Sequence, residues 1–189
     1  MGYIVDEKFE KIIFSEKPLK PGEYEECTFD RCDFSNARLA EFRFIDCEFR
    51  DCNLSLVVLN NTTFRDVKFV GCKMLGLHFE DCDLLGFTVS FENCKLQNST
   101  FFKVKMKKTV LKNCDLKETD FSEAEMSESI FDNCDLHRAV FDHTNLEKVD
   151  FRTAYNYTIN PSQNRIKKAR FSLPGLPGLL AEYGIDVSD

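Results

Sequence analysis

The sequence contains no tryptophan, and its aromatic residues are almost all phenylalanine, with 19 Phe against 5 Tyr in 189 residues. Phenylalanine has no polar group, so it suits an interior that excludes water. No stretch approaches the roughly 18 apolar residues of a membrane-spanning helix. Residues 1–11 also lack the basic start and apolar run of a secretory signal peptide. These absences predict a cytoplasmic protein with a dry core, in a compartment where thiols stay reduced.

Motifs typical of enzymes are missing as well. The sequence has no glycine-rich phosphate loop, no HExxH and no GxSxG. His78, His137 and His143 share no spacing and fall at positions that we expect to face solvent. An enzyme would need a site built at the ends of the fold or in residues 152–168. We therefore expect no catalytic residue, no metal site and no cofactor.

A five-residue repeat runs through most of the chain. From Tyr24 every fifth residue is large and apolar as far as Leu84, and after a two-residue slip near 85–90 the series runs from Phe91 to Phe151. The residue two places earlier is mostly small, and all 9 cysteines occupy that position. Side chains alternate across an extended segment, so the small and the large residue share one face. Each quintet is therefore predicted to be a short extended segment followed by a turn.

A longer period of twenty residues is superimposed on the first, because the segments ENCKL, KNCDL and DNCDL begin at residues 92, 112 and 132. Twenty residues contain four quintets, so each turn of the coil should have four sides. Equivalent residues would stack about 4.8 Å apart on successive turns, as neighbouring strands do. One predicted column contains Cys32, Cys52, Cys72, Cys94, Cys114 and Cys134. The column beside it contains Phe29, Phe49, Phe69, Phe91, Leu111, Phe131 and Phe151.

A small residue, any residue, Leu or Phe and two polar residues form a pattern that resembles the pentapeptide-repeat family. The resemblance covers residues 24–151, with a final copy at 169–173, and implies an all-β fold, a right-handed quadrilateral β-helix. Outside the repeat we expect residues 1–23 to form an N-terminal cap, as a strand or hairpin over the first coil. Residues 152–168 read as an insertion, and residues 174–189 as a short C-terminal helix and tail.

The nine thiols allow several interpretations. Structural zinc sites use short spacings such as Cys-x2-Cys, which the sequence lacks. Stacked cysteines have parallel Cβ vectors, which are unfavourable for disulfide geometry. We interpret the thiols as small, inert, buried hydrophobic groups. The alternative is redox sensing, which would require reactive cysteines.

Four apolar residues of the tail recur at helical spacing and predict one apolar stripe, formed by Leu176, Leu179, Leu180 and Tyr183. Pro177 suits the first turn of a helix, and Gly184 suits its end. The stripe could cover the last coil, or it could contact a second copy of the chain. The sequence leaves both uses open.

The formal net charge is −7, and acidic residues are concentrated between residues 115 and 135. A basic segment at 103–112 precedes them, and a second basic group follows at 165–170. Outward-facing charge keeps any solenoid in solution, and this is the simplest interpretation. The alternative is an acidic partner-binding surface formed by Asp115, Glu118, Asp120, Glu123, Glu125, Glu128, Asp132 and Asp135.

The acidic surface and the tail resemble Qnr-type quinolone-resistance proteins and MfpA, which bind DNA gyrase or topoisomerase IV, although their projecting loops are absent here. The resemblance implies a non-enzymatic protein-binding solenoid and a partial DNA mimic. A homodimer through the C-terminal helix is one of the two uses that its apolar stripe leaves open. Duplex DNA carries about one charge per 1.7 Å, so a chain of this net charge could imitate DNA only along one acidic stripe. The alternative function is an interaction or regulatory scaffold whose partner is unrelated to DNA. Direct binding to nucleic acid or membrane is not expected.

Overall fold

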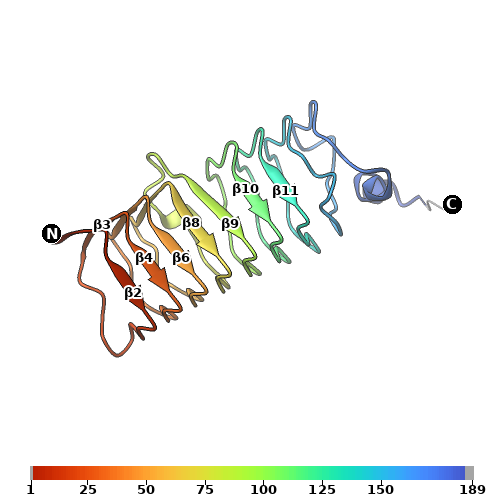
Figure 1. The fold of residues 1–189 in the computed structure, drawn as a ribbon. Coiled ribbons are helices and arrows are strands. Elements are labelled where there is room, and N and C mark those ends of the chain that lie inside the picture. Colours follow the sequence, from red (N-terminus) through yellow and green to blue (C-terminus); the bar gives the residue numbers. More distant parts are fainter. Residues whose placement is uncertain (1, 186–189) are drawn as a thin grey trace.

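The computed structural model describes residues 2–185 and shows a parallel β-solenoid. Successive strands lie side by side along the axis, and the helical turns of the tail lie beyond the last coil (Figure 1). Strands pair in register one coil apart, as where Phe29 lies opposite Phe49. This arrangement confirms the predicted all-β quadrilateral helix.

Two parallel sheets form two sides of the solenoid, which we number 1 and 2 in chain order. Side 1 contains β1 (Gly2–Val5), β3 (Gly22–Glu25), β5 (Arg43–Ile45) and β7 (Thr63–Arg65). Side 2 contains β2 (Lys8–Glu10), β4 (Thr28–Asp30), β6 (Glu48–Arg50), β8 (Val67–Val70), β9 (Val89–Glu92), β10 (Val110–Lys112) and β11 (Ile130–Asp132). Sides 3 and 4 follow in each coil and are held by single bridges, such as Asp33 with Asn53 and Arg38 with Val58.

Each side ends at a corner where one residue takes the left-handed backbone conformation. Asn93, Asn113 and Asn133 have φ angles of 55°, 53° and 51° at such corners. Asparagine tolerates this conformation better than most residues do. The Nδ2 of Asn113 donates to Oδ1 of Asn93 at 3.1 Å, and the Nδ2 of Asn133 donates to Oδ1 of Asn113 at 2.8 Å. The recurring Asn-Cys pair thus combines a corner residue with an inward-facing thiol.

Stacked rings fill the interior. The ring centroids of Phe29 and Phe49 are 4.7 Å apart, and those of Phe49 and Phe69 are 5.1 Å apart, with interplanar angles of 13° and 22°. Rings of neighbouring columns meet edge to face, as where Phe44 lies 5.3 Å from Phe49 at 73°. Such offset and perpendicular contacts suit the charge distribution of aromatic rings. The predicted phenylalanine column is confirmed.

The N-terminal segment forms a further coil, where the sequence pattern predicted a capping strand or hairpin. β1 pairs with β3, and β2 with β4, in parallel and in register, whereas a hairpin would pair its strands antiparallel. The five-residue series continues backward from Tyr24 through large apolar residues, namely Leu19, Phe14, Phe9 and Ile4. The pattern was obscured because the positions that should be small hold Lys17, Ile12 and Glu7.

The two-residue slip lies at the edge between sides 1 and 2. Phe69 pairs with Phe91, which is 22 residues later in the sequence, whereas paired residues of the earlier coils on this side are 20 residues apart. The extra residues fall between Asp83 and Val89. Leu85 points outward in this bulge and is 75% exposed. Side 4 of the preceding coil carries a short 3-10 turn, η1 (Phe79–Asp81).

The segment predicted as an insertion also follows the coil. Tyr155 bridges Asp135 on side 3, and Arg165 bridges Asn145 on side 1. The tail then forms η2 (Leu173–Gly175), α1 (Pro177–Leu180) and η3 (Ala181–Tyr183). Pro177 begins α1, and Gly184 ends η3 with a φ of 59°. The rest of the predicted tail, residues 186–189, lies outside the described residues.

Candidate interaction surface

The eight acidic residues proposed as one surface encircle the solenoid. The backbones of Asp115 and Asp135 form a parallel β-bridge on side 3, so the segment between them is one complete turn. Asp120 lies on side 4, where it bridges Val140, and Glu125 lies on side 1, where it bridges Asn145. Asp132 ends β11 on side 2. Glu118, Glu123 and Glu128 have φ angles of 56°, 55° and 64° and occupy the corners between these sides. The expected single acidic stripe is therefore wrong, because a cluster along the sequence becomes a ring around the coil.

Several of these carboxylates have a basic partner one coil away. The three corner pairs have N···O distances of 3.6, 3.4 and 3.2 Å, and they are Glu118–Arg138, Glu123–Lys103 and Glu128–Lys148. Lys117 Nζ bridges two further carboxylates at 3.3 and 3.2 Å, those of Asp115 and Asp135. Basic residues within the acidic segment and one coil before or after it thus supply counter-charges for five of the eight carboxylates. Among the described residues, Asp120, Glu125 and Asp132 have no ion pair.

Hydrogen bonds also hold two members of the ring, Asp135 and Glu125. Burial opposes ionisation of Asp135, but Asn156 and Lys117 donate to its carboxylate and lower the pKa of Asp135 below its usual value. Asn145 Nδ2 donates to Glu125 at 2.5 Å, and with neighbouring donors it lowers the pKa of Glu125 in spite of partial burial. These carboxylates therefore stay ionised at neutral pH.

All nine cysteines are buried and free, as expected for the interior position. Most of their thiols are also hydrogen-bond donors, which the sequence analysis missed. Cys52 Sγ donates to the carbonyl of Phe29, one coil earlier, at 3.3 Å. Thr119 Oγ1 makes the same bond to the carbonyl of Leu96 at 3.0 Å. The signal was present in the sequence, because serine and threonine share this position with cysteine and have in common a small side chain with a donor.

Burial suppresses ionisation of the thiols. It raises the pKa of Cys47 to about 12 and also raises the pKa of Cys82. Because the thiolate is the reactive form of cysteine, the thiols of Cys47 and Cys82 are poorly suited to redox sensing.

We expect that no thiol of the native protein reacts with an aromatic disulfide reagent at about pH 8, because all 9 thiols are buried. An accessible thiol, with an ordinary pKa of about 8.5, would be partly ionised and reactive at this pH. After unfolding in concentrated guanidinium chloride, all 9 should react. The measurement is the absorbance of the released thiolate over time. A thiol that reacts in the native protein as fast as free cysteine would contradict this expectation and favour the redox alternative.

The four apolar residues of the tail divide between two environments. Leu179 packs against the buried core, whereas Leu176 is 41% exposed and Tyr183 is 62% exposed. Leu180 is partly buried. The backbone of Gly178 approaches the last coil closely, since its carbonyl accepts a hydrogen bond from Ile159 N at 3.0 Å. The tail therefore covers the last coil through one part of the stripe and exposes the other part.

The pattern described as a pentapeptide repeat region matches residues 23–88, 86–155 and 104–172, which together cover most of the chain. The chain belongs to the pentapeptide-repeat family. No curated protein sequence matches it.

Solved pentapeptide-repeat structures are similar in fold. QnrB1, a plasmid-mediated fluoroquinolone resistance protein, is 18% identical and has a TM-score of 0.45, covering 97% of this chain and 100% of its own. HetL of the cyanobacterium Nostoc sp. strain PCC 7120, involved in heterocyst differentiation regulation, is 12% identical with a TM-score of 0.49, covering 90% and 84%. Rfr23 of the cyanobacterium Cyanothece 51142 is 16% identical with a TM-score of 0.23, covering 56% and 88%. At these identities the likeness concerns the fold alone.

Residues 2–185 of this pentapeptide-repeat protein contain no group of three or more His, Cys, Asp or Glu side chains placed to hold a metal ion. In the same part of the chain, no helix has the length and apolar character needed to cross a membrane. His78 and His143 are exposed and lie against single carboxylates, those of Glu80 and Asp142. His137 is also exposed.

Proposed function

We propose that this pentapeptide-repeat protein is a non-enzymatic, cytoplasmic solenoid that binds another protein. The observation that carries the proposal is the division of each quintet. Its two inward positions are filled with buried apolar or small side chains along the coil, as Phe121 and Thr119 are. Its three outward positions carry the charge. A ligand therefore meets the outer surface or the two ends, which favours a macromolecular partner over a small molecule.

DNA gyrase or topoisomerase IV is the partner that we propose to test first. The support is the repeat pattern and the tail, which resemble those of Qnr-type proteins, together with a net charge of −7. The ring arrangement restricts the proposed DNA mimicry, because a partner on one side can contact only part of the ring. A regulatory scaffold with a partner unrelated to DNA is the alternative function.

The ring allows the binding side to be located with single substitutions. Glu118→Lys, Glu123→Lys and Glu128→Lys each change one corner of the same coil, and each removes one exposed ion pair, which costs at most about 1 kcal/mol. The assay is supercoiling by gyrase from the source organism, with and without a fluoroquinolone. We expect the wild-type protein to inhibit gyrase or protect it from the drug, and one reversal to weaken this effect about tenfold or more.

The other two reversals are matched controls, because they change the net charge equally on different edges. Equal weakening by all three would indicate a response to net charge and would contradict a defined binding side. An absence of any effect of the wild-type protein on gyrase and on topoisomerase IV would reject the topoisomerase proposal and leave the scaffold.

We also propose that the exposed part of the tail can contact a second copy of the chain. Leu173 is 83% exposed and Ile185 is 55% exposed, and with Leu176 and Tyr183 they form an apolar surface at the end of the solenoid. Such a contact would depend on burial of apolar area and would not weaken as salt is added.

A further inference from the structure

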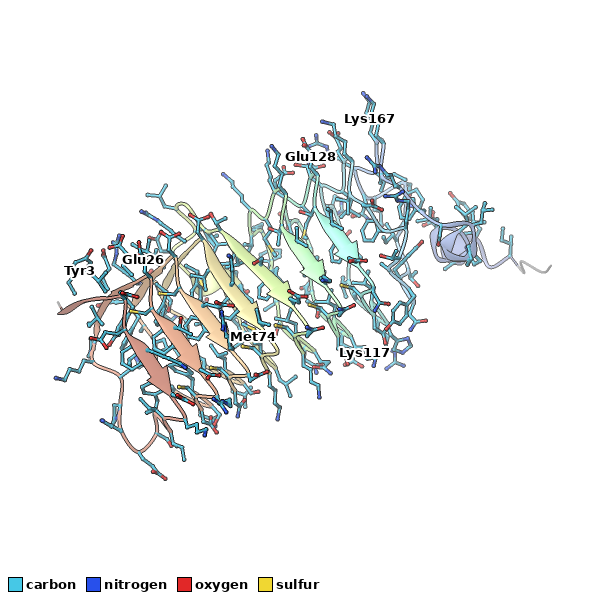
Figure 2. All side chains as sticks on the ribbon, in the orientation of Figure 1. Tyr3, Glu26, Met74, Lys117, Glu128 and Lys167 are labelled. Atoms are coloured by element: carbon cyan, nitrogen blue, oxygen red, sulfur yellow. The ribbon has the colours of Figure 1, made fainter. Side chains whose placement is uncertain are left out.

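The edge between sides 1 and 2 carries charge of opposite sign in its two halves. We call the two outward columns along this edge the ridge. Its N-terminal half holds five acidic residues, Asp6, Glu25, Glu26, Asp46 and Asp66, with one basic residue, Arg65. Its C-terminal half holds five basic residues, Lys107, Lys108, Lys148, Lys167 and Lys168, with two acidic residues, Glu128 and Glu147. Figure 2 shows Glu26, Glu128 and Lys167 along one edge and Lys117 on the opposite edge.

The acidic half of the ridge is uncompensated within the chain. The ion pairs among residues 2–185 include none of its five carboxylates, and Glu25 accepts a hydrogen bond from Tyr3. Asp6, Glu26, Asp46 and Asp66 are exposed and occupy successive coils, so like charges repeat at about the 4.8 Å spacing of strands. In the basic half, Lys148 pairs with Glu128 at 3.2 Å, and the other four lysines have no ion pair among the described residues.

The middle of the ridge is apolar. The two-residue slip places Leu85, 75% exposed, in the coil between the two halves. Gly86 follows it at the corner with a φ of 75°. Four coils lie on each side along the corner column, from Asp6 to Asp66 before it and from Lys108 to Lys168 after it. The two halves of the ridge therefore have opposite net charge on either side of an exposed leucine, with five acidic residues against one basic residue before it and five basic against two acidic after it.

We propose that two copies of the chain associate along this ridge, antiparallel and related by a two-fold axis at Leu85. A two-fold axis brings each residue near it against its own copy, and a leucine meeting a leucine is favourable there. The same axis brings Asp6 opposite Lys168, Glu26 opposite Lys148 and Asp66 opposite Lys108 of the second copy. Asp46 falls opposite Glu128, which already has Lys148 as its counter-charge. In the column that contains Leu85, Glu25 falls opposite Glu147 and Arg65 opposite Lys107, so the attraction comes from the corner column and from the opposite net charge of the two halves. Parallel pairing would instead bring like charges together along both halves.

Complementary charge of this kind sets the orientation of partners, and its contribution depends on ionic strength. At about 0.1 M salt the screening length is about 10 Å, and at about 1 M it is about 3 Å. Association along the ridge should therefore weaken steeply with salt, unlike the apolar contact proposed for the tail. Salt dependence separates the two modes of dimerisation.

The first experiment is sedimentation equilibrium of the full chain at about 50 mM and about 500 mM sodium chloride, a range over which the screening length falls severalfold. We expect a dimer at low salt whose dissociation constant rises about tenfold or more at high salt. A monomer at both concentrations, or a dimer that salt does not weaken, would overturn the proposal.

The second experiment exchanges charge between the halves. One variant carries Glu26→Lys, Asp46→Lys and Asp66→Lys, and the other carries Lys108→Glu, Lys148→Glu and Lys168→Glu. Each variant alone should be monomeric at low salt, and an equimolar mixture should form a heterodimer. Circular dichroism of each variant establishes that it folds. A variant that folds and dimerises as the wild type does, or a mixture that stays monomeric, would also overturn the proposal.

Discussion

Replacing Phe49 by alanine is expected to lower the free energy of unfolding by about 3–5 kcal/mol, the cost typical of removing a buried aromatic ring. Phe49 is 0% exposed and stacks between Phe29 at 4.7 Å and Phe69 at 5.1 Å. Phe44 and Phe34 contact it edge to face. The cavity would lie within a continuous column whose neighbours are held by their own coils, so the site can collapse only slightly.

Denaturant unfolding followed by circular dichroism measures this loss. Phe102→Ala is the matched control, because Phe102 is 36% exposed. The Nζ of Lys103 lies over its ring, 4.5 Å from the ring centroid. Its removal should cost about 1 kcal/mol or less, as for most exposed side chains. Equal losses in the two variants would show that the ring columns do not stabilise the solenoid as argued.

Replacing Cys114 by aspartate is expected to cost several kcal/mol and to abolish cooperative folding in a marginally stable solenoid. Cys114 is 2% exposed and lies in the column between Cys94 and Cys134. A carboxylate there would lose its hydration without a basic partner inside the coil. It would either remain charged at high cost or bind a proton, with its pKa raised by burial.

Cys114→Ser is the control for this substitution. Cys114 Sγ donates to the carbonyl of Phe91 at 3.6 Å, and a serine hydroxyl can make the same bond, as Ser129 Oγ does to Met106 at 2.7 Å. The serine variant should unfold within about 1 kcal/mol of the wild type, consistent with the net contribution of one hydrogen bond. If thermal unfolding showed the aspartate variant to be as stable as the serine variant, the column would have to be open to water.

The proposed ridge and the proposed gyrase contact can be distinguished. Glu128→Lys changes a residue of both the ridge and the ring, whereas Glu118→Lys changes a corner that the ridge does not include. A loss of gyrase activity on Glu118→Lys, with unchanged self-association, would place the partner away from the ridge. Glu128→Lys places a lysine opposite Asp46 of the second copy and should strengthen self-association, so a loss of gyrase activity together with tighter dimerisation would indicate that dimerisation and partner binding use the same edge.

The repeat was predictable from the sequence because its cause is local. Five residues are enough to specify a short extended segment and a corner, and the inward pair repeats its chemistry at every coil. The phenylalanine and cysteine columns followed from the twenty-residue period, and the structure contains both. The N-terminal coil was missed because Glu7, Ile12 and Lys17 are not small, although Phe9 and Phe14 keep the period. Glu7 and Lys17 are exposed in the structure, so these positions do not need small side chains.

The arrangement of charge along the surface was decided only by the tertiary structure. Residues that are close in the sequence lie next to one another around the circumference of a coil. The acidic segment from Asp115 to Asp135 is therefore a ring. Closeness along the axis requires residues one coil apart, so Asp46 and Asp66 become neighbours through the solenoid alone. The sequence by itself determined what faces inward, because alternation along an extended segment sets the inner face. The stacking of coils determined which charges meet, because it joins residues that the chain separates by a full turn.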